Sequence, residues 1–509
     1  MRPYRTLTIV LILALSVFHL WFIASGRWPL SGDEAHYWEW SRRLDWSYYS
    51  KGPMVAYLIA AGVRLAGATA FGVRLPAVVL AAGLATLAAV MASRLFQSAR
   101  AGLLTVLILG VIPLYAVGSV LMTIDPPFVF CWTLAAYFLS RAARRRGEMA
   151  WYGAGIAFGL GLLSKYTMAL LAPCALLWLL CSPRLRPWLR RREPYEALLL
   201  GLLIFSPVIV WNLRHGMLSA RHVLTQAGME SGGHSLSLGW AGEFLGSQVL
   251  VVSPLLFLLF GAASVWAWRE ARRPGREELR LLVCLSVPVF LFFQAWSLFS
   301  KVQANWAAPA YVTAAVALVG WSDGWGRSGA PWRHTRRLNA LLLASIILPA
   351  AALPILFFPE LLGIVGARMP ASLDLVAKRL RGWPELGQTV GEIMRAGPRP
   401  PFLMSDRWQT ASELAFYVPG QPRVFNPNLG GRRMNQYDLW GGWEALQGQD
   451  GLFVVQDSVE APPPLREAFA EVELVRRVPV VVDGRALRTF SIFRGRDFRG
   501  FPPRGFDGY

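Results

Sequence analysis

Acidic and basic side chains gather where apolar segments of this chain begin or end. The residues concerned are Asp33, Glu34, Asp125, Lys165 and Lys301. An ionisable residue at membrane depth is costly and usually marks a site of function. A carboxylate can serve as a general base, and a lysine can neutralise a phosphate. The pattern therefore predicts catalysis at a membrane surface.

The first acidic pair lies in an aromatic cluster. Residues 32–53 read GDEAHYWEWSRRLDWSYYSKGP, so that Asp33 and Glu34 precede Tyr37 and several tryptophans, and Lys51 closes the segment. Aromatic neighbours partly desolvate a carboxylate, which favours a base or a tight hydrogen-bond acceptor. A solvated acidic loop is the alternative, because aromatic residues are also common at membrane interfaces.

The other candidates each have an ordinary structural explanation as well. Asp125 stands in LMTIDPP, where the two prolines can begin a helix with the carboxylate at its N-terminus. A helix-capping role would explain Asp125 without function. Lys165 and Lys301 could be lysines that extend along apolar surface toward water. Convergence of all three on one face of the membrane favours the functional interpretation.

Composition identifies the chain as a polytopic α-helical membrane protein. Its 509 residues are 54% hydrophobic and only 16% charged, with a mean hydropathy of +0.39. A soluble protein would carry about 25% charged residues. The apolar residues come in blocks of roughly 15 to 25, long enough to cross a bilayer core of about 30 Å as helices.

The formal net charge of +20 comes largely from short loops between apolar segments. Positive-inside orientation and contact with anionic lipid explain this distribution without nucleic acid, so we expect membrane lipids rather than nucleic acid as partners. Five arginine-rich loops are expected on the cytoplasmic side. They are 94–100, 141–146, 184–192, 269–280 and 327–337.

These loops predict about eleven crossings and place the C-terminal region outside the cytoplasm. The first crossing is expected to be an uncleaved helix, because its apolar stretch is longer than that of a usual signal peptide. Residues 54–67 are expected to lie in the interface, with a true crossing as the alternative. The expected crossings are 7–25, 75–95, 101–119, 126–140, 150–163, 166–181, 195–212, 241–268, 279–298, 304–321 and 338–357.

The composition changes near residue 358, which predicts a membrane domain over 1–358 and a small α/β domain over 359–509. The second domain is expected to contain helices at 373–395 and 412–417. Its expected strands are 401–406, 451–457, 478–482 and 488–493, the last two joined by a turn at 483–484.

Cysteine and histidine spacing indicates no metal centre. The four cysteines all fall in apolar segments, and no disulfide framework or CxxC motif occurs. His36, His215, His222 and His234 match no closed metal motif. We therefore expect no required cofactor, while a divalent metal remains an alternative.

Taken in order, these motifs resemble those of the bacterial relatives of protein O-mannosyltransferases, the family that includes the aminoarabinose transferase acting on lipid A. The shared features are an Asp-Glu pair with a nearby tyrosine after the first helix, a later Lys-x-Pro, and an Asp-Pro that opens a middle helix. The resemblance covers about residues 5–320. It implies a GT-C glycosyltransferase fold and a polyprenyl-phosphate sugar donor.

The resemblance also implies roles for individual residues. Asp33 matches the family's essential first-loop aspartate, Glu34 its neighbour, Lys51 the lysine that contacts the donor phosphate, and Asp125 the second acidic position. Two departures are present: the common Lys-Pro-Pro is Lys51-Gly52-Pro53 here, and Ser50 replaces the glutamate of the aminoarabinose enzyme. These departures weaken the transfer of a metal site and of that sugar specificity to this chain.

These observations predict a transferase of the bacterial inner membrane with a periplasmic catalytic face. The predicted catalytic residues are Asp33, Glu34 and Asp125, and the predicted donor phosphate ligands are Lys51, Lys165 and Lys301. Tyr37 and Asn305 are expected to contact the acceptor or the sugar.

The acceptor could be a lipid such as lipid A, a glycan or a protein. The alternatives are a transporter or flippase of a lipid-linked sugar and a non-catalytic scaffold. A transporter would usually show inverted repeats and charges near the bilayer midplane, and neither is visible here.

Overall fold

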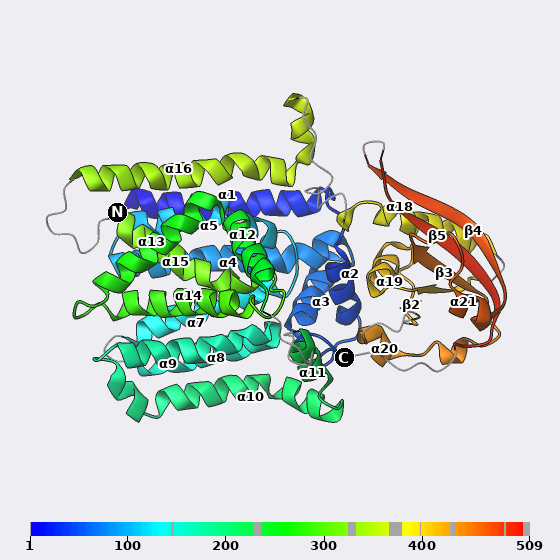
Figure 1. Cartoon of the computed structure of the whole chain (residues 1–509), viewed down its shortest axis with the longest axis horizontal. Helices are drawn as coiled ribbons and strands as arrows, with labels where there is room; N and C mark the ends of the chain where they lie inside the picture. The colour runs from blue at the N-terminus through cyan, green and yellow to red at the C-terminus, as the bar shows by residue number, and fades with distance from the viewer. Residues whose placement is uncertain are drawn as a thin grey trace.

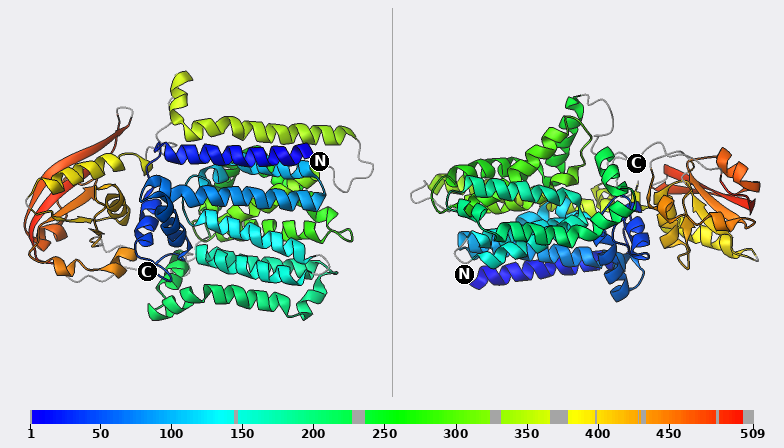
Figure 2. Two further views of the ribbon diagram at one scale, coloured as in Figure 1. Left: turned by 180° about the vertical axis from the view of Figure 1, so that it is seen from behind. Right: turned by 90° about the horizontal axis from the view of Figure 1, so that it is seen from below.

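The computed structural model describes residues 2–143, 147–226, 236–323, 332–365, 379–397, 399–427, 429, 434–482 and 485–501. A bundle of long helices lies beside a smaller region built around a sheet (Figures 1 and 2). Two short helices, α2 (Gly32–Ser41) and α3 (Met54–Ala66), lie between them.

The long helices of the bundle lie side by side with their axes roughly parallel (Figure 1). They are α1 (Arg2–Ala24), α4 (Ala70–Phe96), α5 (Ala99–Val111), α7 (Asp125–Ala142), α8 (Glu148–Ser164), α9 (Leu171–Cys181), α10 (Glu193–Arg214), α13 (Pro254–Glu270), α14 (Glu277–Trp296), α15 (Ala308–Ser322) and α16 (Trp332–Phe357). Helix α12 (Leu238–Val252) precedes α13 and lies at a steep angle to it. Short helices join or follow them: α6 (Pro113–Gly118), η1 (Tyr166–Leu170), η2 (Arg186–Arg190), α11 (Leu218–Gln226), η3 (Ala304–Ala307) and η4 (Pro359–Val365).

Five of the described helices are long and apolar enough to cross a membrane, and the bent pair α12–α13 is a sixth candidate. The five are α1, α4, α10, α14 and α16. Each predicted crossing coincides with a helix or with consecutive helices, several of them shorter than a full span. The chain is therefore a multi-pass membrane protein, and the complete topology of eleven crossings stays a prediction.

The predicted crossing at 241–268 is bent. Residues 241–268 form two helices, α12 and α13, whose axes meet at 102°. Ser253 between them has φ 99°, and Pro254 begins the second helix. Proline lacks the N–H that would continue the ladder and restricts the residue before it, so the chain turns here.

The interfacial placement expected for the segment 54–67 stays a prediction. The segment forms α3, which lies across the end of the bundle rather than along the long helices (Figure 1). Helix α2 lies beside it at the same end (Figures 1 and 2). The predicted site residues of α2 therefore lie on a short helix at the end of the bundle.

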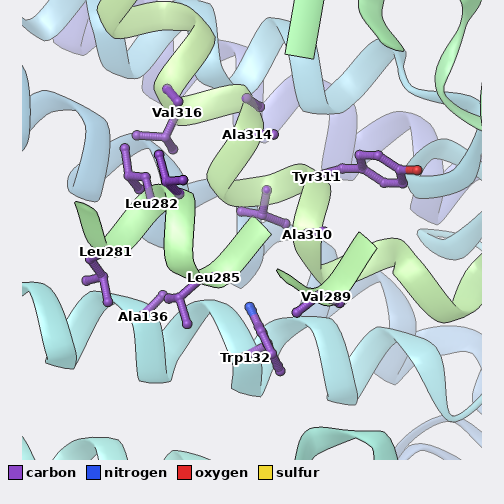
Figure 3. Close-up of a cluster of buried hydrophobic side chains, with 14 of the residues drawn as sticks. Trp132, Ala136, Leu281, Leu282, Leu285, Val289, Ala310, Tyr311, Ala314 and Val316 are labelled. Carbon is purple, nitrogen blue, oxygen red and sulfur yellow. The ribbon is translucent and has the colours of Figure 1, made fainter. Parts of the chain in front are cut away.

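The centre of the bundle is packed with small and branched side chains. Helix α15 is buried on nearly every side, as expected for a helix that is apolar all round. Ala310 of α15 lies near Leu285 and Val289 of α14, with Trp132 of α7 nearby (Figure 3). Small residues let neighbouring helices approach closely, which supports dispersion contacts in a membrane.

The C-terminal region contains a five-stranded sheet in the order β2-β1-β3-β5-β4. The strands are β1 (Phe402–Ser405), β2 (Val424–Phe425), β3 (Gly451–Gln456), β4 (Phe469–Val482) and β5 (Arg485–Phe498). Strand β1 pairs in parallel with β2 and β3, whereas β5 pairs antiparallel with β3 and β4. The region also holds α18 (Trp383–Arg395), α19 (Trp408–Tyr417), α20 (Gln436–Trp440), η5 (Glu444–Leu446) and α21 (Pro463–Ala468).

The strands predicted at 401–406, 451–457, 478–482 and 488–493 are confirmed, although β4 and β5 are longer than expected. The short β2 and helix α20 were not predicted. The expected helix 373–395 lies partly outside the described residues, as does the turn at 483–484.

Helix α19 joins the C-terminal region to the bundle. It lies between the sheet and α2 (Figure 1), and side chains of α2, α19 and the sheet share one apolar cluster. Polar contacts reinforce it: the Tyr417 hydroxyl accepts from the Leu30 N–H at 2.7 Å, and His36 Nδ1 lies 3.0 Å from the Ser412 hydroxyl. The C-terminal region therefore helps to fix the position of α2.

Candidate active site

A polar cavity of about 390 Å³ lies where the end of the bundle meets the C-terminal region. Asp33, Tyr37, Lys51, Asp125, Lys165 and Asn305 all line it, so the structure brings together six of the eight predicted site residues. The remaining lining residues are His36, Tyr49, Ser50, Thr123, Ile124, His222, Gln226, Gln303, Trp306, Trp408, Met434, Asn435 and Gln436.

Asp33 lies in the first turn of α2, which a capping box of Ser31 and Glu34 begins. Its side chain is open to the cavity but enclosed by the surrounding protein. This burial raises the pKa of Asp33, although the nearby cations of Lys51 and Arg379 oppose the rise. Within the described part of the chain, its carboxylate forms no hydrogen bond or ion pair. Asp33 can therefore accept a proton or a hydrogen bond from a ligand.

Asp125 lines the same cavity and is held by two partners. Lys165 Nζ lies 2.8 Å from Asp125 Oδ1, and Asn305 Nδ2 donates to Asp125 Oδ2 at 2.6 Å. Asp125 opens α7, and Lys165 ends α8 in extended conformation. Three segments far apart in sequence thus meet at one carboxylate, whose negative charge Lys165 largely neutralises.

Lys51 is a cation without such a partner. Its Nζ lies 3.5 Å from Gln226 Oε1, and among the described residues it forms no ion pair. Burial, together with the like charge of Lys165, lowers the pKa of Lys51 to about 8. The ammonium is consequently available to an anion that enters the cavity.

Gly52 explains how Lys51 comes close to Lys165. A Cβ at Gly52 would lie 2.1 Å from the Leu163 carbonyl oxygen, near the end of α8. Only a residue without a side chain allows the two backbones to approach this closely. The departure from Lys-Pro-Pro is therefore a packing requirement in this chain.

Tyr37 faces the same cavity from the next turn of α2. Burial raises the pKa of Tyr37 well above its usual range, and the negative charges of Asp33 and Asp125 add to the effect. The phenol therefore stays protonated and can donate a hydrogen bond to a ligand.

Glu34 does not line the cavity, which corrects the catalytic role predicted for it. Arg74 of α4 donates to both of its oxygens, with Nε–Oε1 at 2.8 Å and Nη2–Oε2 at 2.7 Å. The Met122 N–H also donates to Oε1 at 3.0 Å, and the carboxylate is fully buried. Glu34 therefore joins α2 to α4 and to the segment before Asp125, which is a positioning role.

Lys301 is the second correction. Its side chain is 68% exposed and pairs with Glu243 at 2.8 Å, outside the cavity. The residues that follow it, Gln303 and Asn305, line the cavity instead. A snorkelling lysine, the alternative considered from the sequence, describes Lys301 better than a phosphate ligand.

No group of three or more His, Cys, Asp or Glu side chains in the described residues could hold a metal ion. His36 is buried, which lowers its pKa to about 3 and keeps the ring neutral, and Trp40 Nε1 donates to its Nε2. His215 stacks on Trp211. His222 lines the cavity, and His234 lies outside the described residues.

Several site residues were missed from the sequence. Arg74 was overlooked, although an arginine in an otherwise apolar helix is the kind of residue that marks function. Trp408, Asn435 and Gln436 come from the C-terminal region, and the Tyr49 N–H donates to Gln436 Oε1 at 2.7 Å. No pattern in the sequence connects these residues with the first loop, since tertiary packing alone brings them together.

A second, more apolar pocket of about 210 Å³ adjoins the polar cavity. It shares Ser50, Lys51, Lys165, Gln226 and Trp306 with that cavity. Its other walls include Tyr166, Phe292, Phe293 and Trp296. The two lysines therefore lie at the boundary between a polar and an apolar space.

The fold resembles that of GT-C membrane enzymes. The solved structure of ArnT from Cupriavidus metallidurans in the apo state matches 95% of this chain and 97% of that chain, with a TM-score of 0.63 at 16% sequence identity. The Archaeoglobus fulgidus oligosaccharyltransferase in the apo form matches 83% of this chain and 65% of that chain, with a TM-score of 0.53 at 13% identity. At these identities the likeness shows the fold alone.

Sequence comparison identifies the relatives within that class. The family model described as dolichyl-phosphate-mannose-protein mannosyltransferase matches residues 50–211. The lipid A galacturonosyltransferase RgtD of Rhizobium johnstonii is 32% identical over 293 residues, which cover 56% of this chain and 59% of that protein. The undecaprenyl phosphate-alpha-4-amino-4-deoxy-L-arabinose arabinosyl transferase of Pseudomonas paraeruginosa is 31% identical over 311 residues, 55% of this chain and 54% of that protein.

The resemblance predicted from the motifs is therefore confirmed as a similarity: parts of the chain match the mannosyltransferase family model and two bacterial enzymes named as lipid A galacturonosyltransferase and aminoarabinose transferase. The matched segments span less than two thirds of the length of these two relatives.

Proposed function

We propose that this chain is an integral membrane glycosyltransferase that moves a sugar from a polyprenyl-phosphate donor to a lipid, glycan or protein acceptor. The observation that carries the proposal is one cavity beside an apolar pocket that is lined by Asp33, Lys51 and the Asp125–Lys165 pair, where Asp33 and Lys51 form no ion pair with any described residue. Residues 1–358 would form the catalytic membrane domain, and 359–509 a domain that closes the cavity.

The donor phosphate would bind Lys51. Lys165 is partly neutralised by Asp125, whereas Lys51 has no carboxylate partner among the described residues. A preorganised cation stabilises charge that develops on a leaving phosphate, especially where water is excluded. Arrival of the donor phosphodiester, which carries one negative charge, would also favour the protonated form of Lys51, and the second negative charge develops on the phosphate as its bond to the sugar breaks.

The polyprenyl chain would leave the cavity through the adjoining apolar pocket. Tyr166, Phe292 and Trp296 provide aromatic walls beside the two lysines. A lipid phosphate needs an anionic site next to a hydrocarbon path, and this arrangement supplies both. A solved ArnT structure from Cupriavidus metallidurans carries undecaprenyl phosphate, which supports this class of donor.

The reaction would be a direct displacement at the anomeric carbon. The acceptor hydroxyl oxygen forms the new bond to that carbon, and its proton passes to the Asp33 carboxylate. The bond from the anomeric carbon to the phosphate oxygen breaks, and its electron pair remains on the phosphate near Lys51. Tyr37 and Asn305 would orient the sugar or the acceptor. A raised pKa suits Asp33 to this exchange near neutral pH.

Among acceptors, lipid A is supported by the names of the relatives. RgtD of Rhizobium johnstonii is named for transfer to lipid A. An acceptor carried in the outer leaflet would approach the cavity from the membrane end at which the C-terminal region lies.

The periplasmic side is proposed for that end. The α9–α10 and α13–α14 connections are rich in arginine and lie at the other end of the bundle, beside the start of α1 (Figures 1 and 2). By the positive-inside rule, this other end faces the cytoplasm. A transporter is less well supported, because the charged groups gather at one end of the bundle and both relatives are named as transferases.

The test is transfer by the purified full-length chain with Asp33→Asn. Membrane extract would supply donor and acceptor, and mass spectrometry of the lipid fraction would measure the product. Loss of a positioned base is expected to lower the rate by about 10²- to 10⁴-fold.

Glu385→Gln is the matched control, because Glu385 is an exposed carboxylate in the first turn of α18. Its rate should equal that of the parent. An Asp33→Asn protein that transfers sugar at the parental rate would refute the catalytic assignment, and donor translocation into vesicles would then test the transporter alternative.

A further inference from the structure

A large groove in the bundle takes no part in the candidate active site. It measures about 860 Å³ and lies between α13, α14 and α15. None of its lining residues lines the polar cavity or the pocket that adjoins it. The groove therefore requires its own explanation.

The groove follows α13 along much of the bundle. One wall runs along α13 from Phe257 to Arg269, and the rise between these two residues of a helix is about 18 Å. Leu258, Val265 and Trp268 on this wall are 68%, 51% and 43% exposed. A long apolar groove open on the side of a membrane bundle is suited to a hydrocarbon chain.

The polar groups inside the groove are already satisfied. The Ser264 hydroxyl donates to the Phe260 carbonyl, and the Ser286 hydroxyl donates to the Leu282 carbonyl. Tyr311 donates to Gln248 at 2.6 Å. The groove interior therefore favours a chain without polar groups along its length.

Charge is concentrated at one end of the groove. Arg269 and Arg272 line this end and are exposed, and neither forms an ion pair with any residue that the structure describes. Arg273 differs, since it pairs with Glu270 at 2.8 Å. Trp268 lies beside the two arginines, as tryptophans often do at the headgroup level of a membrane.

We propose that this groove binds one anionic phospholipid of the leaflet at the arginine-rich end of the bundle. An acyl chain would lie along α13 and α14, and the headgroup phosphate would lie between Arg269 and Arg272. Basic residues at the end of an inter-helix pocket attract anionic headgroups, whereas a zwitterionic headgroup gains less. The C-terminal end of α13 lies away from the C-terminal region (Figure 1), so this lipid differs in place from the proposed sugar donor.

The chain offers a way to fill the groove without disturbing the fold. Gly261 of α13 lines it, and a Cβ there would meet no atom within 4 Å. Gly261→Leu would place a bulky side chain in the path of the acyl chain. Gly242→Leu on α12 is the matched control, since a Cβ at Gly242 also meets no atom and Gly242 does not line the groove.

The experiment is native mass spectrometry of the full-length protein in detergent, titrated with phosphatidylglycerol or phosphatidylcholine. The parent should bind phosphatidylglycerol more tightly. The double change Arg269→Gln with Arg272→Gln should weaken phosphatidylglycerol binding by about 30-fold, because two arginine contacts are lost. Gly261→Leu should weaken binding of both lipids, whereas Gly242→Leu and Arg190→Gln, an exposed arginine of η2, should bind as the parent does.

Equal binding of the two lipids by the parent would overturn the proposal, as would groove variants that bind like their controls. Undecaprenyl phosphate is the third probe. Bound phosphatidylglycerol is competed with either undecaprenyl phosphate or further phosphatidylglycerol. If undecaprenyl phosphate competes at the lower concentration, the groove binds the donor lipid and the proposal is wrong. Binding is measured without sugar transfer, so this result is independent of the proposed function.

Discussion

At the scale of single residues, the cavity contains two aspartates and two lysines, of which one aspartate and one lysine form an ion pair with each other. Lys165 and Asp125 form a direct ion pair at 2.8 Å, held further by Asn305. Asp33 and Lys51 influence each other's pKa without forming an ion pair. A paired carboxylate is already satisfied, so Asp33 and Lys51, which form no ion pair in the described part of the chain, are the groups left to react with or bind a ligand.

Lys51→Met should remove donor binding while keeping most of the apolar stem. Loss of one preorganised charge at a transition state is expected to lower turnover by about 10²- to 10³-fold. The measurement is sugar transfer per folded protein. Lys301→Met is the matched control, because Lys301 is exposed and outside the cavity, and its rate should stay unchanged. Equal losses in both variants would contradict a specific phosphate site at Lys51.

We expect kcat/KM to pass through an optimum and to fall at both lower and higher pH. Below the optimum, Asp33 becomes protonated and loses its function as a base, and its raised pKa moves this fall to higher pH than an ordinary aspartate would give. Above it, Lys51 loses its charge as the pH rises through about 8. Lys51→Arg should retain activity at alkaline pH, because arginine stays protonated. If kcat/KM of Lys51→Arg falls at alkaline pH as it does in the parent, the titrating group is not Lys51.

At the scale of elements, the site depends on short segments held by longer helices. Glu34 and Arg74 fix α2 against α4 through a buried bidentate contact. Helix α19 supports α2 from the other side, and the breaks after α8 and before α7 turn Lys165 and Asp125 toward the cavity. Precise placement therefore comes from packing around α2, rather than from α2 itself.

Gly52→Ala should disturb the site through the backbone. The added methyl group would lie 2.1 Å from the Leu163 carbonyl oxygen, so the loop carrying Lys51 must move away from α8. Overpacking of this kind typically costs about 1–3 kcal/mol. We expect a lower thermal midpoint and a lower transfer rate. Gly118→Ala, where a Cβ meets no atom within 4 Å, should change neither, and an equally mild effect at Gly52 would refute the close contact.

At the scale of the whole molecule, the cavity is an interface between two parts of the chain. Asp33, Lys51, Asp125 and Lys165 come from the membrane part, while Trp408, Asn435 and Gln436 come from the C-terminal region. The end of the bundle that lines the cavity and the C-terminal region must therefore lie on the same side of the membrane. The orientation of the C-terminal region consequently sets the side on which transfer would occur.

Topology reporters should place the C-terminal region in the periplasm. An enzyme that is active only after export, fused after Gly451, should be active, because the arginine-rich loops are expected in the cytoplasm. The same reporter fused after Arg190, in such a loop, should be inactive. Activity after Arg190 with none after Gly451 would reverse the proposed orientation of the site.

The sequence by itself determined the class of protein and the chief chemical groups. Apolar blocks and arginine-rich loops follow from the cost of moving charge into lipid, so hydropathy alone identified a multi-pass membrane protein. Asp33, Lys51 and Asp125 were found because their positions at the ends of apolar segments, and the motif they share with known relatives, are local properties of the chain. Gly52 was noticed only as a departure from that motif.

Tertiary structure alone decided which charges meet. Glu34 and Lys301 carry the same groups as Asp33 and Lys165, yet Arg74 engages Glu34 and Glu243 pairs with Lys301 outside the cavity. Such pairings join residues 40 or more positions apart, and no sequence period encodes them. The contribution of Gln436 and the bend between α12 and α13 could not be predicted from the sequence either, because both depend on the surfaces that each segment contacts after folding.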